Sequence, residues 1–515
     1  MFPCIRDAHK SLLKCDISVT KLCNNAFDQI EATKNLNAFI TIRREDALKE
    51  ASKLDTLLKN NDQSKVHSTL FGIPISVKDN FCTNQILTTC GSKMLHNFVP
   101  PYDATVVSKL KKANSIIVGK TNMDEFAMGS SCTTSYYNCA ANYWKRELLN
   151  GLTPSECKDP KRWFMAGGSS TGSAISVASG ACFASIGTDT GGSTRQPASL
   201  TGCVGFKPTY GLISRFGLIP LAHCLDVVSI LARNVDDTSL IFEHVIGQDE
   251  NDLTSVDHKT VLKIDNWSSN SFNDRKIRIG IPEEFVCKGQ LSSDVSSHYN
   301  ETITRLSSLN TELVNIRLPS ASLATECYTI ISSAEIASNM SCYDGVKYGL
   351  SVPFNETGNR SFDRDEFFKC NRDAGFGPEV KKRILLGNYF MLSENREKYL
   401  QQAFKVRRLI SEDFSRAFRL DKVDVILLPS TPTTSTSYWE WLSKQNDNKL
   451  FGEDYYLIPA NLANVPSISL PSGLSSNNLP IGSQLIADRF HDRDLLMISK
   501  FFESTVFNRT YDASI

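Results

Sequence analysis

The stretch from Gly167 to Arg195, which reads GGSSTGSAISVASGACFASIGTDTGGSTR, constrains this chain more than any other part of its sequence. It contains two Gly-Gly-Ser turns, ending at Ser169 and Ser193, and the small residues between them have the spacing of a helix. Glycine pairs permit backbone conformations that other residues avoid, and they leave amide N–H groups unshielded by side chains. Such N–H groups beside a serine oxygen can hold the oxyanion of a tetrahedral intermediate, a contribution of roughly 3–4 kcal/mol per donor in other enzymes. The stretch therefore predicts an acyl-transfer site, with a serine at each end of a helical connection.

A second stretch, residues 71–80, predicts a short strand that ends in a lysine. Its apolar residues alternate with other residues, which is the period of a half-buried strand. Lys78 ends this strand on the face opposite Ile73 and Ile75. An amine is therefore expected at the end of a strand of the sheet.

The two stretches together resemble the amidase signature family, whose members use a Ser–cisSer–Lys triad. Three long and specific motifs carry the resemblance: residues 167–173, residues 187–195 (GTDTGGSTR) and residues 202–209 (GCVGFKPT). The resemblance implies that Ser193 is the nucleophile that forms the acyl ester, that Ser169 bridges the charge relay, and that Lys78 is its base. It also implies a cis peptide bond before Ser169. The backbone donors of the oxyanion hole are assigned to Thr190, Gly191 and Gly192.

These roles agree with the chemistry that the residues can support. A serine becomes a strong nucleophile only when a base takes its proton, and histidine is the commonest base. The histidine nearest in sequence to either serine turn is His223, in a different motif. A lysine can replace histidine only when it is neutral, and burial lowers its pKa from about 10.4. We therefore expect a neutral Lys78 to draw a proton through Ser169 from Ser193, and the same relay to deliver one to the leaving ammonia.

Within this family, the chain resembles the glutaminase subunits of tRNA-dependent amidotransferases over nearly its whole length. The matching motifs are residues 123–129, 208–218, 379–384 and 458–463. Their positions imply that Arg383 meets the carboxylate of glutamine and Asp454 its amino group, with Tyr328 beside them. An arginine fork suits a carboxylate and an aspartate suits an ammonium group, so an α-amino acid amide is a reasonable substrate.

The resemblance also implies a setting for the reaction. Glutamine would be hydrolysed to supply ammonia for converting Glu-tRNA(Gln) to Gln-tRNA(Gln) in mitochondrial translation, within a heterotrimer that contains subunits B and C. No cofactor is expected in this chain, because ATP and Mg would be used by the partner subunit, which would also make most of the contacts with the tRNA. The segment 144–163 resembles an insertion of the longer organellar forms, which favours the mitochondrial matrix over the cytoplasm.

Strands that alternate with helices predict an α/β layered fold. The resemblance implies the amidase signature fold, a large mixed β-sheet core layered between α-helices. We expect a single domain over 1–515, with an N-terminal helical region at about 1–65, a signature core at about 66–245, an insertion at about 144–163, and a C-terminal part at about 277–500 that completes the same sheet. Helices are expected at 18–34, 44–59, 104–113 and, as two or more, 378–418; strands are expected at 36–40, 115–120, 277–281, 423–429 and 481–486.

Composition limits the remaining possibilities. Lys plus Arg equals Asp plus Glu at 56 each, so the formal net charge is zero, whereas a sole carrier of nucleic-acid affinity would usually be more basic. The 15 cysteines include no Cys-x-x-Cys pair, so buried free thiols in a reducing compartment are expected rather than metal ligands or disulfides. No apolar run reaches the length of a membrane span. Arg6, Lys10 and Lys14 suit either a mitochondrial presequence or an ordinary first helix.

Other interpretations of the same residues remain open. Residues 168–172 fit the Gly-x-Ser-x-Gly elbow of α/β-hydrolases, which would make Ser170 the nucleophile but would leave the second glycine turn unexplained. A phosphate-binding loop would need a Gly-Lys-Ser/Thr ending that is missing. The chain could also be a stand-alone amidase of the same family acting on another amide, although an apolar amide would leave Arg383 and Asp454 unpaired. A non-catalytic assembly subunit would have no chemical use for the intact triad.

Two residues depart from the family pattern. Thr171 and Ser229 stand where glycine is usual. A β-branched residue at position 171 is comfortable only when its backbone has a negative φ. The triad itself is unaltered.

Overall fold

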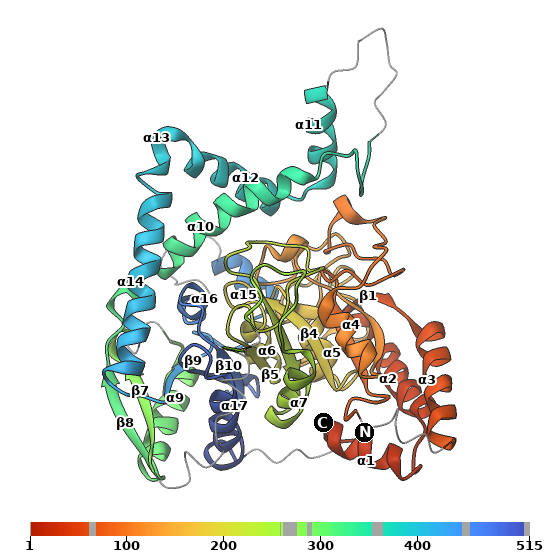
Figure 1. Cartoon of the computed structure of the whole chain (residues 1–515), viewed down its shortest axis with the longest axis horizontal. Coiled ribbons are helices and arrows are strands. Elements are labelled where there is room, and N and C mark those ends of the chain that lie inside the picture. Colours follow the sequence, from red (N-terminus) through yellow and green to blue (C-terminus); the bar gives the residue numbers. More distant parts are fainter. Residues whose placement is uncertain are drawn as a thin grey trace.

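One mixed β-sheet of eleven strands organises the computed structural model, which describes residues 2–60, 68–257, 259–260, 275–285, 291–352, 364–444 and 454–508. The strands lie in the order β1-β3-β2-β4-β6-β5-β10-β11-β9-β7-β8. Helices surround this sheet (Figure 1), and the predicted α/β layered fold is confirmed. The strands are β1 (Phe39–Ile42), β2 (Pro74–Lys78), β3 (Ile116–Thr121), β4 (Ala184–Asp189), β5 (Val204–Lys207), β6 (Val227–Ala232), β7 (Ile277–Pro282), β8 (Thr311–Ile316), β9 (Val425–Pro429), β10 (Ser467–Leu474) and β11 (Pro480–Ile486).

Most of the helices pack into two hydrophobic clusters. The main core packs the sheet against α1, α2, α3, α4, α7, α9 and α17, and a second core joins α10, α12, α14 and α16 to β9. The helices are α1 (Ile5–Leu13), α2 (Val19–Ala32), α3 (Arg44–Lys59), α4 (Thr105–Lys112), α5 (Thr171–Ala178), α6 (Arg195–Thr201), α7 (Val235–Val245), α9 (Ser293–Ser307), α10 (Ala324–Asn339), α11 (Arg364–Gly375), α12 (Pro378–Met391), α13 (Ser393–Arg396), α14 (Leu400–Arg419), α15 (Tyr438–Lys444), α16 (Ile458–Leu462) and α17 (Asp492–Phe501).

Most of the elements expected from sequence periodicity are present. The helices expected at 18–34, 44–59 and 104–113 appear as α2, α3 and α4, and Ser18 caps α2 by accepting from the Lys21 N–H at 3.0 Å. The strand expected at 36–40 begins later, as β1, because a short 3-10 helix (Lys34–Leu36) and the left-handed Asn37 (φ +56°) come first. The segment 144–163 contains one 3-10 turn (Arg146–Leu149) and is otherwise irregular. Residues 61–65 and 509–515 of the expected single domain lie outside the described residues.

Strand β2 lies between β3 and β4 and is parallel to both. Every residue of β2 is buried, so the expectation of a half-buried strand is wrong. Its polar Ser76 is held by the Ser176 and Ser185 hydroxyls at 2.9 and 2.8 Å instead of by solvent. Because β2 and β4 run parallel, Lys78 and the turn that follows β4 lie at the same edge of the sheet, where ligands bind in open α/β sheets.

The connection between the two serine turns is only partly helical. Helix α5 follows Ser169 directly, but the chain then enters strand β4, which pairs with β2 and β6 and leads to Ser193. The expectation of one helical connection is therefore wrong for its second half, because pairing with two neighbouring strands decides the conformation of residues 184–189.

Strands from the C-terminal part of the chain lie in the same sheet as those of the signature region. Strand β10 pairs antiparallel with β5, with Ser467 opposite Lys207, and β11 and β9 follow. The sheet is therefore continuous across this junction.

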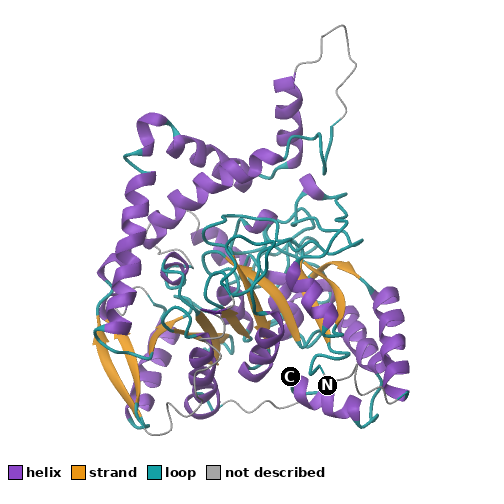
Figure 2. Ribbon diagram, viewed as in Figure 1, coloured by secondary structure: helices purple, strands orange, loops and turns teal. Residues whose placement is uncertain are grey.

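Helices α10, α12, α13 and α14, called here the helical lobe, stand above the sheet (Figure 1). Helices α10 and α12 pack closely at Gly387, where a Cβ would lie 1.9 Å from the Ser333 carbonyl oxygen. Loops gather between the central strands and this lobe (Figure 2). The turn before Ser193 reaches the lobe, because a Cβ on Gly191 would lie 2.9 Å from the ring of Tyr328 in α10.

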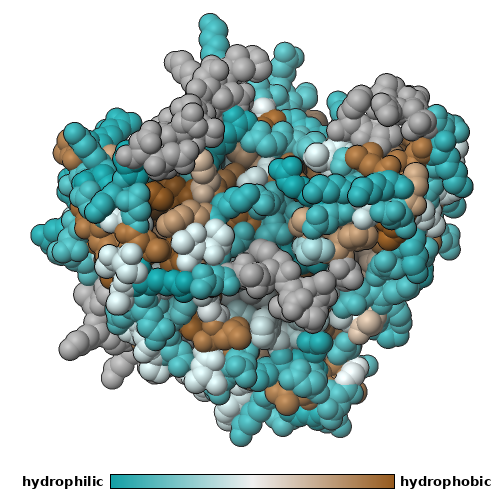
Figure 3. Space-filling view, turned by 90° about the horizontal axis from the view of Figure 1, so that it is seen from below, coloured by the Kyte–Doolittle hydropathy of each residue, from teal (hydrophilic) through white to brown (hydrophobic). Residues whose placement is uncertain are grey.

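The surface visible in Figure 3 mixes polar and apolar residues, and the N-terminal helix packs into the core. The face in Figure 3 is largely hydrophilic, with apolar patches separated by polar residues. Helix α1 packs into the main core through Ile5, Ala8 and Leu12, and the Ile5 N–H donates to Asp237 at 2.8 Å. No helix within the described ranges combines the length and apolar character needed to cross a membrane.

Candidate active site

Lys78 is fully buried at the end of β2, and its amine contacts three hydroxyl groups. Its Nζ donates to Ser169 Oγ at 2.8 Å, to Ser170 Oγ at 3.0 Å and to Thr188 Oγ1 at 2.8 Å. Burial lowers the pKa of Lys78 from 10.5 to about 7, even though nearby aspartates favour the charged amine. At pH 7 about half of this amine is therefore neutral, and in that form it donates to two of the hydroxyls and can accept from the hydroxyl of Ser169.

Ser169 lies at the start of α5, and the peptide bond between Gly168 and Ser169 is cis, as the resemblance implied. The Gly168 N–H donates to Gln196 Oε1 at 2.7 Å. A Cβ on Gly168 would lie 2.2 Å from Asp124 Oδ2, so only glycine fits here without movement. Thr171 forms the first residue of α5 with a negative φ, and its hydroxyl donates to the Gly167 carbonyl, so this departure from the family pattern fits the local backbone.

Ser193 lies on the turn after β4 and is partly exposed, whereas Ser169 and Lys78 are fully buried. The Ser170 N–H donates to the Ser193 carbonyl oxygen at 3.0 Å, which joins the two serine turns. The order of exposure suits a relay in which the serine closest to solvent meets the substrate and the lysine lies deepest.

Asp189 shapes the turn that carries Ser193. Its carboxylate accepts from the N–H groups of Gly192 at 2.9 Å and Thr194 at 3.2 Å, and from Arg195 Nε at 3.0 Å. Although burial alone would raise it, the Arg195 guanidinium holds the pKa of Asp189 well below its usual range. Arg195 also donates to Asn461 Oδ1 at 2.5 Å and Gln484 Oε1 at 2.6 Å, so the C-terminal part of the chain supports the turn.

The three assigned oxyanion donors are not equivalent. The Gly192 N–H is already used by Asp189, so the structure does not support it as an oxyanion donor. Among the described residues, the Thr190 and Gly191 N–H groups donate no hydrogen bond. Thr190 is fixed by its hydroxyl, which donates to Asp226 Oδ1 at 2.7 Å. The N–H groups of Thr190 and Gly191 remain candidates for the oxyanion hole.

Tyr328, Arg383 and Asp454 come together beside this turn, although they are far apart in sequence. A Cβ on Gly191 would lie 2.9 Å from the Tyr328 ring, and one on Gly192 would lie 3.0 Å from Asp454 Oδ1. Arg383 interacts electrostatically with Tyr328, and its Nε donates to Glu379 Oε1 at 2.8 Å. Burial raises the pKa of Tyr328 to about 12, so its hydroxyl is neutral at pH 7. An acid and a phenol therefore adjoin the turn of the proposed nucleophile, and an arginine lies beside the phenol.

Sequence reasoning missed the side chains that support the triad. Ser170 and Thr188 share the Lys78 amine, and Asn461 and Gln484 hold Arg195. Ser170 and Thr188 lie inside the quoted motifs, where their closeness to the serine turns was a usable signal. Asn461 and Gln484 contact Arg195 only through the tertiary fold, and Gln484 lies in none of the motifs.

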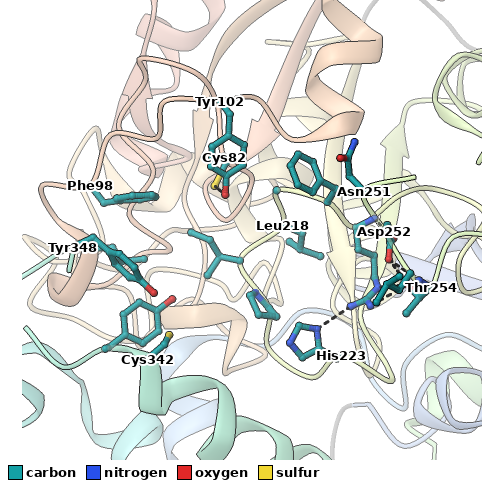
Figure 4. A pocket seen from close by; sticks show the side chains of 18 residues that line it. Cys82, Phe98, Tyr102, Leu218, His223, Asn251, Asp252, Thr254, Cys342 and Tyr348 are labelled. Carbon is teal, nitrogen blue, oxygen red and sulfur yellow. Dashed lines mark hydrogen bonds between the residues drawn. The ribbon is translucent and has the colours of Figure 1, made fainter. Parts of the chain in front are cut away.

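A separate cavity of about 640 Å³ lies between residues 82–102, 215–223, 251–254 and 342–348. Figure 4 shows Phe98 and Tyr348 on one side and the polar residues Asn251, Asp252 and Thr254 on the other, with Tyr102 above and His223 below. The described lining contains no triad residue.

A partly exposed serine on a glycine turn, joined through the Ser170 N–H to the turn of a buried serine that contacts a lysine of lowered pKa, fits a serine hydrolase that works without histidine. A family model described as Amidase matches residues 21–496, and the chain belongs to this family. The resemblance inferred from the sequence motifs is confirmed.

Relatives and solved structures agree with this assignment. Proteins named as the mitochondrial A subunit of glutamyl-tRNA(Gln) amidotransferase, from Pediculus humanus subsp. corporis and Homo sapiens, are 43% and 40% identical over 502 and 508 residues; both matches cover 98% of this chain, and 97% and 93% of the relative. The crystal structure of the A subunit of glutamyl-tRNA(Gln) amidotransferase from Thermotoga maritima is 32% identical with a TM-score of 0.72, covering 95% of this chain and 92% of that one. A peptide amidase from Stenotrophomonas maltophilia, at 23% identity and a TM-score of 0.74 over 99% of each chain, shares the fold.

The lowered pKa of Lys78 predicts how amide hydrolysis depends on pH. The relay needs the neutral amine, so kcat/KM should rise with pH through a pKa of about 7. The rate at pH 6 should be about tenfold below that at pH 8, because the neutral fraction changes by that factor. A pH profile of kcat/KM checks this expectation.

Lys207 provides the control for this profile. Its pKa is also lowered to about 7, but its Nζ donates to the carbonyl oxygens of Pro208 and Val465 and to no serine hydroxyl in the described structure. Lys207→Met should therefore keep the midpoint of the profile. A flat profile in the unmodified protein would contradict the role of Lys78.

Proposed function

We propose that this chain is the glutaminase subunit of a tRNA-dependent amidotransferase. One observation carries the proposal: Asp454 and Tyr328 adjoin the Gly191-Gly192 turn that precedes Ser193, and Arg383 lies beside Tyr328. A guanidinium and a carboxylate in this arrangement suit the α-carboxylate and α-ammonium groups of glutamine. The side-chain amide of the same molecule would then reach Ser193.

The proposed reaction follows the buried relay. Neutral Lys78 takes a proton from Ser169 as Ser169 takes one from Ser193, and Ser193 Oγ attacks the amide carbon of glutamine. The N–H groups of Thr190 and Gly191 hold the oxyanion. The relay returns a proton to the departing nitrogen, which leaves as ammonia, and water then attacks the glutamyl ester to release glutamate.

The names of the relatives support the wider setting of the proposal. Subunits B and C would complete a heterotrimer, and ammonia would pass to a partner that amidates Glu-tRNA(Gln) with ATP and Mg. This chain would need no cofactor of its own, since acyl transfer to serine requires only the residues described. The relatives named as mitochondrial support placement in the mitochondrial matrix.

Measuring ammonia and glutamate release from glutamine, with and without the partner subunits, tests the proposal. Release that depends on the partners supports the amidotransferase role. Hydrolysis of an apolar amide in preference to glutamine would instead indicate a stand-alone amidase. An absence of turnover on any amide, with the complex intact, would indicate an assembly subunit.

Replacing Arg383 with alanine should raise KM for glutamine about 10- to 100-fold with a smaller change in kcat, because a charge-assisted hydrogen bond contributes about 1.5–3 kcal/mol. Steady-state kinetics in the assembled complex measure this change. Lys382→Ala is the matched control, because its side chain is 67% exposed on the same helix. Equal KM values for the two variants would contradict the role of Arg383.

A further inference from the structure

Glu125 is a buried carboxylate that the relay does not use. The residue is 3% exposed, and its two carboxylate oxygens each accept one hydrogen bond: Oε1 from Ser92 Oγ at 2.6 Å, and Oε2 from the Gly377 N–H at 2.9 Å. Burial raises the pKa of Glu125 to about 7, and both hydrogen bonds favour its charged form. The two hydrogen bonds therefore satisfy this buried carboxylate and fix its position.

Gly377 is the N-cap of α12, so Glu125 binds the N-terminus of that helix. A carboxylate there satisfies a free N–H group and interacts favourably with the helix dipole. The fit is close, because a Cβ on Gly377 would lie 2.3 Å from Glu125 Oε2. The contact therefore fixes where α12 begins.

The backbone after Glu125 has an unusual conformation. Phe126 and Ala127 have φ values of +49° and +61°, in the left-handed region that costs non-glycine residues roughly 1–2 kcal/mol each. This turn places the Phe126 ring against Tyr343 and Phe376, at centroid distances of 5.0 and 5.8 Å. The segment before α12 is thus anchored twice: Glu125 accepts from the Gly377 N–H, and the Phe126 ring packs against Phe376.

Helix α12 carries Arg383, six residues after Gly377, or about 9 Å along the helix axis. A helix moves as a rigid element over this length, so a shift of its N-terminus displaces the guanidinium relative to the Ser193 turn. Glu125 itself hydrogen-bonds to Ser92 and Gly377 and to no triad residue in the described structure. Its influence on the substrate would therefore act through Arg383.

We propose that Glu125 is a positioning residue for substrate recognition: it anchors the N-terminus of α12 and so holds Arg383 where it meets the α-carboxylate of glutamine. The inference rests on the proposed glutaminase function. It concerns the recognition of the carboxylate and leaves the chemistry of the relay unchanged.

The test uses the assembled complex and two substrates, glutamine and 4-aminobutanamide, which is glutamine without its α-carboxylate. Glu125→Ala should raise KM for glutamine about tenfold while kcat stays within about twofold, since the reacting groups are untouched. Its kcat/KM for 4-aminobutanamide should be unchanged. Glu125→Gln keeps an acceptor for the Gly377 N–H and a donor for Ser92, so it should restore KM to within about threefold of the unmodified protein.

Two further variants keep the proposal falsifiable. Glu125→Ala added to Arg383→Ala should change KM less than about twofold, because both act through one contact. If Glu125→Ala fails to fold, Gly377→Ala, which displaces the helix and keeps the carboxylate, should raise KM in the same way. Asp46→Ala, at an exposed carboxylate that pairs with Lys49 within α3, is the control.

The outcomes separate this inference from the proposed function. If the unmodified complex releases no ammonia from glutamine, the proposed function is wrong. If it does, but Glu125→Ala lowers kcat at constant KM, or multiplies the effect of Arg383→Ala, the positioning role is wrong. A loss of activity toward both amides to the same extent would also overturn it.

Discussion

Replacing Ser193 with alanine is expected to lower the rate of glutamine hydrolysis about 10⁴-fold or more, because the acyl ester can no longer form and only binding and the oxyanion donors remain. The substitution removes one partly exposed hydroxyl and leaves the Asp189 contacts of the turn in place. Folding should therefore be retained. Ammonia release by the assembled complex measures the effect, and mass spectrometry of quenched reactions should show a glutamyl adduct on the unmodified chain only.

Ser170→Ala is the matched control, and it also tests the Gly-x-Ser-x-Gly interpretation. Ser170 Oγ is buried, donates to the Thr188 carbonyl oxygen at 3.1 Å, and accepts from Lys78. We expect this variant to keep the glutamyl adduct and to lose far less activity than Ser193→Ala. An adduct that persists in Ser193→Ala and disappears in Ser170→Ala would contradict the assignment of Ser193 as the nucleophile.

The second large effect is expected for Lys78→Met, which replaces the buried amine with an apolar side chain of similar length. Hydrolysis should fall about 10³-fold or more, since Ser169 loses the base that takes its proton. The fold should survive, because replacing a buried ionisable group with an apolar one is often neutral or stabilising.

The pH dependence of the stability should also differ between Lys78→Met and the unmodified protein. The pKa of Lys78 is lowered to about 7 in the folded chain, so between pH 7 and 10.5 the unfolded chain binds more protons. Stability of the unmodified protein therefore rises with pH in that window, and Lys78 destabilises it most at pH 7 and below. Lys78→Met should lack this contribution. Thermal unfolding at pH 7 and 10 measures it, and a lower Tm of the variant at pH 7 would contradict the burial argument.

The sequence motifs predicted the local geometry of the site well. Local residue patterns predict the two glycine turns, the strand that ends at Lys78 and the helix after Ser169, because each depends mainly on residues that are neighbours in sequence. The degree of burial could not be predicted from the pattern, because it depends on the neighbouring strands and on what packs on each face of the sheet. Strand β2 has the pattern of a half-buried strand, but β3 and β4 flank it and all of its residues are buried. Strand β4 consists of small residues that suit a helix equally, and its two partners decide its conformation.

Long-range parts of the site depended on the family resemblance. Arg383, Asp454 and Tyr328 have no periodicity or spacing that relates them, and only the fold places Tyr328 and Asp454 beside Gly191 and Gly192 and Arg383 beside Tyr328. The contact between Glu125 and Gly377 spans 252 residues and has no sequence signal beyond the motif around Glu125. Side chains that meet only through tertiary packing are thus the ones that pattern reasoning cannot find.

The junction between β5 and β10 has a consequence for biosynthesis. During translation, residues 68–245 leave the ribosome long before β10 and β11 exist, so β5 has an unpaired edge open to other chains. Arg195 then lacks Asn461 and Gln484, which arrive near the end of synthesis. The serine turn therefore gains its full support only when the last strands join, and a nascent chain is expected to need a chaperone, and to stay inactive, until then.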